Sequence, residues 1–295
     1  RIHMHHYLRA IGFSNLHTQK QLNFILEDAI KHPTSRSILT IGSGVSLVQL
    51  YKEYGENLGI SIIGEYDSSD ELITEHYFPY FLGSSTKWEE SILIESHTDK
   101  EAYSGVSESY QFGIPLIFFL INISDYVRTK WSNEYNISLN HVSYSGLSTD
   151  GKVILGVDKD EEQIRQEKKG QTKRKHLLAA AKNGDTEAIE NLTLDDIDLY
   201  SSISKRAKSE DLYSIVDSSL VPYGINSEQY SLIGTIQDIH LLQNAVTKET
   251  MYQLLVNVNE TPVDILINTR DLTGEPAVGR RFKGTVWMQG NVVFP

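Results

Sequence analysis

The sequence predicts an α+β protein built from three consecutive parts. Segments with the alternating apolar and polar pattern of strands fill much of residues 35–157 and return from residue 230 onwards, and turn signals between them favour antiparallel sheet. A charge-rich, helix-forming stretch separates the two regions. We therefore predict an N-terminal α+β domain with an antiparallel sheet over residues 1–157, a helical connector over 158–210 and a small C-terminal β-barrel over 211–295.

The N-terminal part begins with a helix and continues as strands. Apolar residues recur at helical spacing between His17 and Pro33, Thr18 is positioned as the N-cap, and the proline ends the helix. Alternating segments follow, and the sequence around Asp150-Gly151 predicts a hairpin with a tight turn at that pair. The predicted strands before it are RSILTIG, VSLVQLYKEYG, LGISIIGEYD, ELITEHYFPYF and ESILIESH.

The connector is rich in charges and predicts three short helices. Gly184 ends one helix and Asp185 caps the next, while Thr193 begins another with acids in its first turn. Five basic residues lie in the centre of this region, and we interpret them as a solvated face of a linker rather than an anion site. They are Lys168, Lys169, Lys173, Arg174 and Lys175.

The C-terminal part predicts four strands and a turn of helix, an element order typical of an OB-like barrel; an SH3-like barrel fits nearly as well. Gly274 and Gly279 are typical of a turn, and Gly284 lies where a barrel strand bends. The strand segments are QYSLIGTIQDIHLL, ETMYQLLVNVN, TPVDILINT and RRFKGTVWMQG, with RDLTGE as the helical turn before the last.

The composition excludes several classes of protein. The chain has 39 acidic and 27 basic residues, a net charge of -12, which repels nucleic-acid phosphates at long range. There are no cysteines, so disulfides, thiolate metal sites and cysteine nucleophiles are excluded. The apolar run Ile114 to Ile123 is about half of the roughly 20 residues that a membrane helix needs. We expect a cytoplasmic protein that does not act in a membrane and starts at Met4.

Two groups of residues are candidate sites. His97 and Glu101 would lie on one face of a helical turn, where they could bind a divalent metal or act in general base catalysis. Structural histidines that pair with nearby acids are the favoured alternative. On the last strand Trp287 has three basic neighbours and could stack a base or a partner side chain, although packing against the N-terminal domain is favoured. The basic neighbours are Arg280, Arg281 and Lys283.

Nucleotide and serine-hydrolase motifs are missing, so no cofactor is predicted. The Gly-x-Gly at residues 42–44 lacks the third glycine of a dinucleotide site, and neither a Walker A lysine motif nor a Gly-x-Ser-x-Gly elbow occurs.

Several phrases together resemble an uncharacterised bacterial family, domain of unknown function 3881. The phrases include HTDKEAYSG, GLSTDGKVILGV, AAAKNGDTEAIENLTLDDIDLYSSIS and DLTGEPAVGRRFKGTVWMQG. The resemblance spans nearly the whole chain and implies a bacterial, cytoplasmic protein. It implies no catalytic residues.

Three functions remain as hypotheses. The first is a non-catalytic binding or scaffolding protein that has a protein partner. The second is a nucleic-acid-associated protein that uses the C-terminal barrel, which the net charge disfavours. The third is a metal-dependent enzyme with a site around His97 and Glu101.

Overall fold

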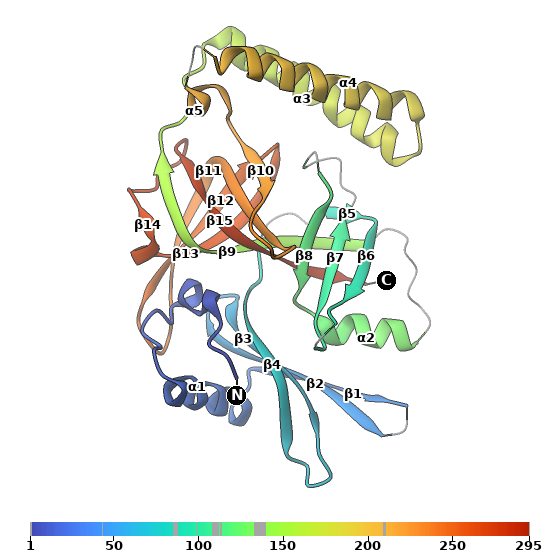
Figure 1. The fold of residues 1–295 in the computed structure, drawn as a ribbon, viewed down its shortest axis with the longest axis vertical. Coiled ribbons are helices and arrows are strands. Elements are labelled where there is room, and N and C mark those ends of the chain that lie inside the picture. The colour runs from blue at the N-terminus through green and yellow to red at the C-terminus, as the bar shows by residue number, and fades with distance from the viewer. Residues whose placement is uncertain are drawn as a thin grey trace.

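The computed structural model of the chain describes residues 2–42, 44–84, 88–98, 100–107, 112, 114–132, 140–208 and 211–294. It is a mixed α+β protein, as the sequence predicts. Two β-sheets form the body, and two long helices lie together at one end of it, at the top of Figure 1.

The N-terminal segment packs a short 3-10 helix and an α-helix on a four-stranded antiparallel sheet. The predicted helix is confirmed as α1 (Gln19–Lys31), where the Thr18 side chain accepts from the backbone of Gln21 and Gln21 reciprocates. Leu22 and Leu26 on its inner face are buried. The other elements are η1 (His6–Ile11), β1 (Ser35–Ile41), β2 (Val45–Gly55), β3 (Leu58–Tyr66) and β4 (Leu72–Phe81), and the strands pair in chain order.

The larger sheet takes strands from before and after the long helices, residues 88–154 and 219–293, and its path runs β10-β11-β12-β13-β9-β15-β8-β7-β6. Its N-terminal members are β5 (Trp88–Glu90), β6 (Ile92–Ser96), β7 (Tyr103–Ser107), β8 (Leu116–Leu120) and β9 (Asn140–Ile154). Its C-terminal members are β10 (Ser219–Pro222), β11 (Gln229–Gln243), β12 (Thr250–Val258), β13 (Thr261–Asn268), β14 (Leu272–Thr273) and β15 (Arg281–Val293), with η2 (Thr269–Asp271) before β14.

Five strands of the larger sheet pair in a closed path. β11 pairs with β12, β12 with β13, β13 with β9 and β9 with β15, and β15 pairs again with β11. The OB-like barrel predicted for residues 211–295 alone is nevertheless not confirmed, since β9 comes from outside that range and stands between β13 and β15.

The hairpin predicted at Asp150-Gly151 is wrong, because β9 continues through this pair as one strand. β15 pairs along its whole length, from Arg281 opposite Ile154 to its other end, with one bulge. A Cβ on Gly151 would come 2.5 Å from the Phe282 ring. The glycine therefore makes room for that ring within the sheet, and long-range pairing decides the backbone here instead of the local turn signal.

The predicted connector contains two long helices rather than short ones. They are α3 (Glu161–Lys182) and α4 (Thr186–Arg206), followed by α5 (Leu212–Ile215); α2 (Ile123–Trp131) follows β8 earlier in the chain. Gly184, with φ +84°, and Asp185 as N-cap form the predicted turn. Thr193 does not begin a helix: its hydroxyl donates to Ile189 O at 2.9 Å within α4. We call α3, α4 and their turn the helical arm (residues 161–206).

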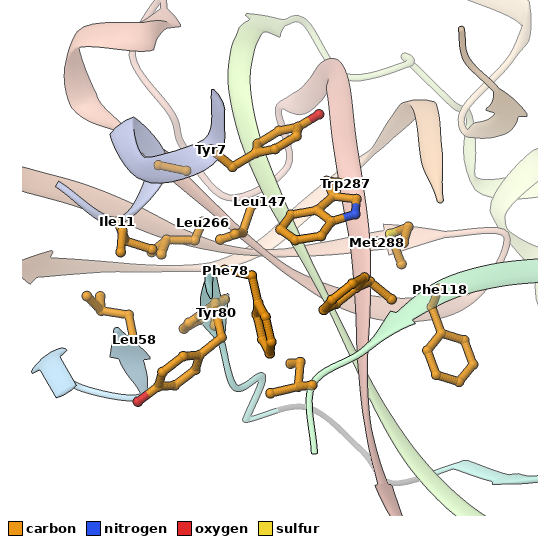
Figure 2. Close-up of a cluster of buried hydrophobic side chains, with 14 of the residues drawn as sticks. Tyr7, Ile11, Leu58, Phe78, Tyr80, Phe118, Leu147, Leu266, Trp287 and Met288 are labelled. Carbon is orange, nitrogen blue, oxygen red and sulfur yellow. The ribbon is translucent and has the colours of Figure 1, made fainter. Parts of the chain in front are cut away.

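A continuous hydrophobic core joins both sheets and η1. Figure 2 shows part of it, with side chains from η1, β3, β4, β8, β9, β13 and β15 packed together. The arm has a separate, smaller cluster, made of Leu178, Ala181, Ala188 and Leu192. Most side chains of the arm therefore pack in neither of the two hydrophobic clusters.

Candidate binding sites

A hollow of about 290 Å³ lies beside β6, β7 and β8, and His97 is in its wall. The other lining residues are Glu95, Ser96, Thr98, Lys100, Ser104, Val106, Ile117 and Ser227. His97 Nε2 is 2.8 Å from Ser104 Oγ and 3.1 Å from Glu228 Oε1. The Ser104 hydroxyl donates to the same Glu228 oxygen at 2.6 Å. These three side chains form a closed hydrogen-bonded triangle, in which Ser104 and Glu228 are buried.

The triangle does not have the arrangement of a serine hydrolase relay. Such a relay places the serine on one nitrogen of the imidazole and the carboxylate on the other. Here Ser104 and Glu228 both approach Nε2, and the serine also donates directly to the carboxylate. The geometry holds the side chains in place without aligning Ser104 to attack a substrate.

The two residues of the predicted metal site are not brought together as expected. The described residues between β6 and β7 (97, 98 and 100–102) are not helical, and His97 N donates to Ala102 O at 2.8 Å. The Glu101 side chain accepts from the Tyr103 hydroxyl, and its backbone carbonyl lies 2.7 Å from His76 Nε2. Among the described residues no group of three or more His, Cys, Asp or Glu side chains could hold a metal ion.

Trp287 lies inside the molecule, where it joins η1 to the larger sheet. It is 7% exposed, and its ring stacks on Tyr7 with centroids 5.3 Å apart. His5 and Phe119 are each 5.0 Å from it, and Figure 2 shows Tyr7 and Trp287 side by side. This packing is the alternative that the sequence favoured.

The basic residues near Trp287 do not share one surface. Arg281 is buried, and its guanidinium donates to three backbone carbonyls, Leu155 O before the arm and Tyr213 O and Val216 O after it. Lys283 Nζ lies 4.3 Å from the Tyr213 ring centroid. Arg280 is exposed and donates to Glu275 O. Arg281 therefore bonds β15 to the backbone on both sides of the arm, at residue 155 before it and at residues 213 and 216 after it.

The arm presents an apolar stripe on α4. Leu194, Ile197 and Tyr200 are 56%, 55% and 74% exposed. At about 100° per residue, this stripe lies on the side of α4 opposite to Ala188 and Leu192, which pack against α3. We call Leu194, Ile197 and Tyr200 the α4 stripe.

Ion pairs between the helices involve two of the five basic residues in the centre of the connector and two of the acids that follow Thr193. Lys173 pairs with Asp195 at 3.3 Å and Arg174 with Asp196 at 2.8 Å. These acids therefore hold α4 to α3 and do not form the first turn of a helix. The α4 stripe has a sequence signal, a spacing of three residues, whereas Ser104 and Glu228 are 124 positions apart and leave no local pattern.

The environment of His5 makes folding sensitive to pH. Burial, and then the positive charge of Lys100 and the neighbouring histidines, lower the pKa of His5 from 6.5 to about 3. The unfolded chain thus binds more protons than the folded chain between these values. The stabilisation is fully present above pH 6.5 and is lost as the pH falls toward 3.

We expect the free energy of unfolding to fall by about 1 to 2 kcal/mol between pH 6.5 and about 4.5 on account of His5. This loss of stability is smaller than the whole pKa shift of His5 would give, because the side chain is only partly buried and solvent weakens the effect. The measurement is urea unfolding at both pH values, with His5→Asn as the comparison. Asparagine can still accept from Tyr7 N, as the His5 ring does, but cannot be protonated. An identical pH dependence in this variant would contradict the assignment.

The fold and these sites define a mixed α+β protein with a projecting helical arm. The chain belongs to the family described as "Domain of unknown function, E. rectale Gene description (DUF3881)", whose model matches residues 8–290. No curated protein matches the chain, and no solved structure matches it either. Within the described ranges, every helix is too short or too polar to cross a membrane.

Proposed function

We propose that the protein is a non-catalytic scaffold that binds a protein partner through the helical arm. The observation that carries the proposal is the α4 stripe, three large apolar side chains that are each more than half exposed on an element outside the main core. Amphipathic helices commonly bind partners through apolar side chains that share one face of the helix. Figure 1 shows α3 and α4 together at one end of the molecule; a contact of the arm with the larger sheet, from Lys182 Nζ to Glu89 O at 3.3 Å, comes from α3 and not from α4.

The arrangement around His97 supports the non-catalytic part of the proposal. His97 and Ser104, which line the hollow, and the buried Glu228 carboxylate are hydrogen-bonded to one another. They contribute to stability by satisfying buried polar groups.

The predicted division of the chain fits the same proposal. Residues 1–157 and 211–295 would act as the body and residues 158–210 as its arm. The closed path of β11, β12, β13, β9 and β15 supports a small barrel, with β9 contributed by the N-terminal part. Arg281 would hold the arm at a fixed place on this body.

We expect a photo-crosslinking amino acid at position 200 to form adducts with a partner protein in cells that naturally produce the protein. Tyr200 is the most exposed member of the α4 stripe, so a bound partner would lie next to it. The matched control is position 24, since Phe24 is 71% exposed on α1, in the body. Adducts would be identified by mass spectrometry. Equal adduct formation at the two positions would contradict the proposal.

The two other functions from the sequence stay predictions. Nucleic-acid binding through Arg280, Arg281, Lys283 and Trp287 would require two of these side chains to become accessible. Arg281 and Trp287 are both buried. A metal site at His97 and Glu101 would require further ligands beyond this pair.

A further inference from the structure

We infer that the partner of the α4 stripe is the α4 stripe of a second copy of this chain, docked antiparallel about a two-fold axis. This inference rests on the proposed function, because it names the partner of the same surface. The order of charges along and just after α4 is self-complementary only in the antiparallel direction.

The charges near the stripe change sign along the helix. Glu187 and Glu190 precede the stripe, and Lys205 and Lys208 follow it. All four are exposed, and none makes an ion pair with a residue in the part of the chain that the structure describes. Acids near the N-terminus and bases near the C-terminus also suit the helix dipole, so each copy tolerates this order on its own.

Helical geometry places these charges on the same side as the stripe. At about 100° per residue, Glu187, Glu190 and Lys205 lie within roughly a third of a turn of the stripe's centre, and Lys208 lies two residues past Arg206, the last residue of α4. Two antiparallel helices related by an axis between Ile197 and Asp198 set Glu190 against Lys205 and Glu187 against Lys208 of the other copy. Each contact occurs twice, as two-fold symmetry requires. A parallel pair would instead bring like charges together.

The side chains of the stripe also fit this register. Leu194 of one helix falls opposite Ser201 of the other, and Ile197 lies next to the axis. Small serines opposite large apolar residues allow two helices to approach closely. Asp198 lies beyond the edge of the stripe, about 100° from its centre, so its carboxylate remains in water. A second copy would thereby complete an arrangement of four helices from two arms.

The test is sedimentation equilibrium of the full chain at increasing protein concentration. We expect the wild type to form dimers and Ile197→Glu to weaken dimerisation about 100-fold, because two apolar side chains at the axis become charged. Leu199→Glu is the matched control, since Leu199 is 60% exposed on α4 but lies outside the stripe. It should leave the dimer unchanged. Circular dichroism checks that each variant is folded.

Charge reversal tests the register itself. Glu190→Lys alone and Lys205→Glu alone should each weaken the dimer about tenfold, because each replaces two attractions by two repulsions. The double variant should recover most of the wild-type affinity. A wild type that stays monomeric, or a double variant no better than the singles, would overturn the second copy as partner. The scaffold would still stand in that case if position 200 crosslinked to a different protein, and would fail if it crosslinked to none.

Discussion

Trp287→Ala is expected to lower the free energy of unfolding by about 4 kcal/mol. The indole is 7% exposed and is packed between Tyr7 of η1 and Phe119 of β8, with ring centroids 5.3 Å and 5.0 Å away. Its removal would leave a large cavity at the point where the N-terminal segment meets the larger sheet. The neighbouring structure can fill this cavity only in part, because its side chains belong to two different layers.

The measurement is chemical denaturation, and the chain offers a matched control. Trp131 is 60% exposed at the end of α2, so Trp131→Ala should change the free energy of unfolding by less than about 0.5 kcal/mol. A similar effect of the two substitutions would show that Trp287 is not part of the core. That outcome would also favour its predicted role in stacking a base.

Arg281→Met is expected to cost about 3 kcal/mol, the second largest effect. The guanidinium donates to three carbonyls at the two ends of the arm segment, in partly buried hydrogen bonds, and the variant would leave a buried position without these three bonds. Burial lowers the pKa of Arg281, and the carboxylates of Asp217 and Asp211 oppose this shift. The arm should therefore become less firmly attached as the protein becomes less stable.

Hydrogen exchange together with chemical denaturation measures both consequences. Amides at residues 155–158 and 212–216 should exchange faster in Arg281→Met, whereas those of β12 should change only through the global loss of stability. Arg280→Met is the control, since Arg280 is exposed and its guanidinium donates to Glu275 O. If the two variants lost equal stability, Arg281 would not be the residue that fastens the arm.

Local signals in the sequence were sufficient for elements that are stabilised locally. The Thr18 N-cap, the spacing of the apolar residues in α1 and the Gly184-Asp185 turn all appear in the structure where the sequence predicts them. The course of β9 as one long strand could not be predicted from the local sequence. Its backbone conformation depends on pairing with β15, more than 120 residues later. The barrel prediction was incomplete for the same reason.

The candidate sites were predictable to different degrees. The sequence identified His97 as a candidate site residue. Its partner Ser104 follows seven residues later on β7, whereas Glu228 comes 131 residues later and only the fold brings it next to His97. The α4 stripe has readable spacing, yet Thr193 was interpreted as a helix start, which divided the helix that carries the stripe. Asp195 and Asp196 then resembled an acidic first turn. Their true role, pairing with α3, depends on the antiparallel packing of two long helices.

The most direct test of the scaffold is a native mass spectrum of the untagged full chain, gently purified from cells that naturally produce it. Our account predicts a complex held together by the arm, either two copies of the chain or the chain with another protein, which dissociates when Ile197→Glu is introduced. A single chain free of protein partners at all concentrations would contradict it. A metal, metabolite or oligonucleotide bound to that single chain would favour one of the other two functions instead.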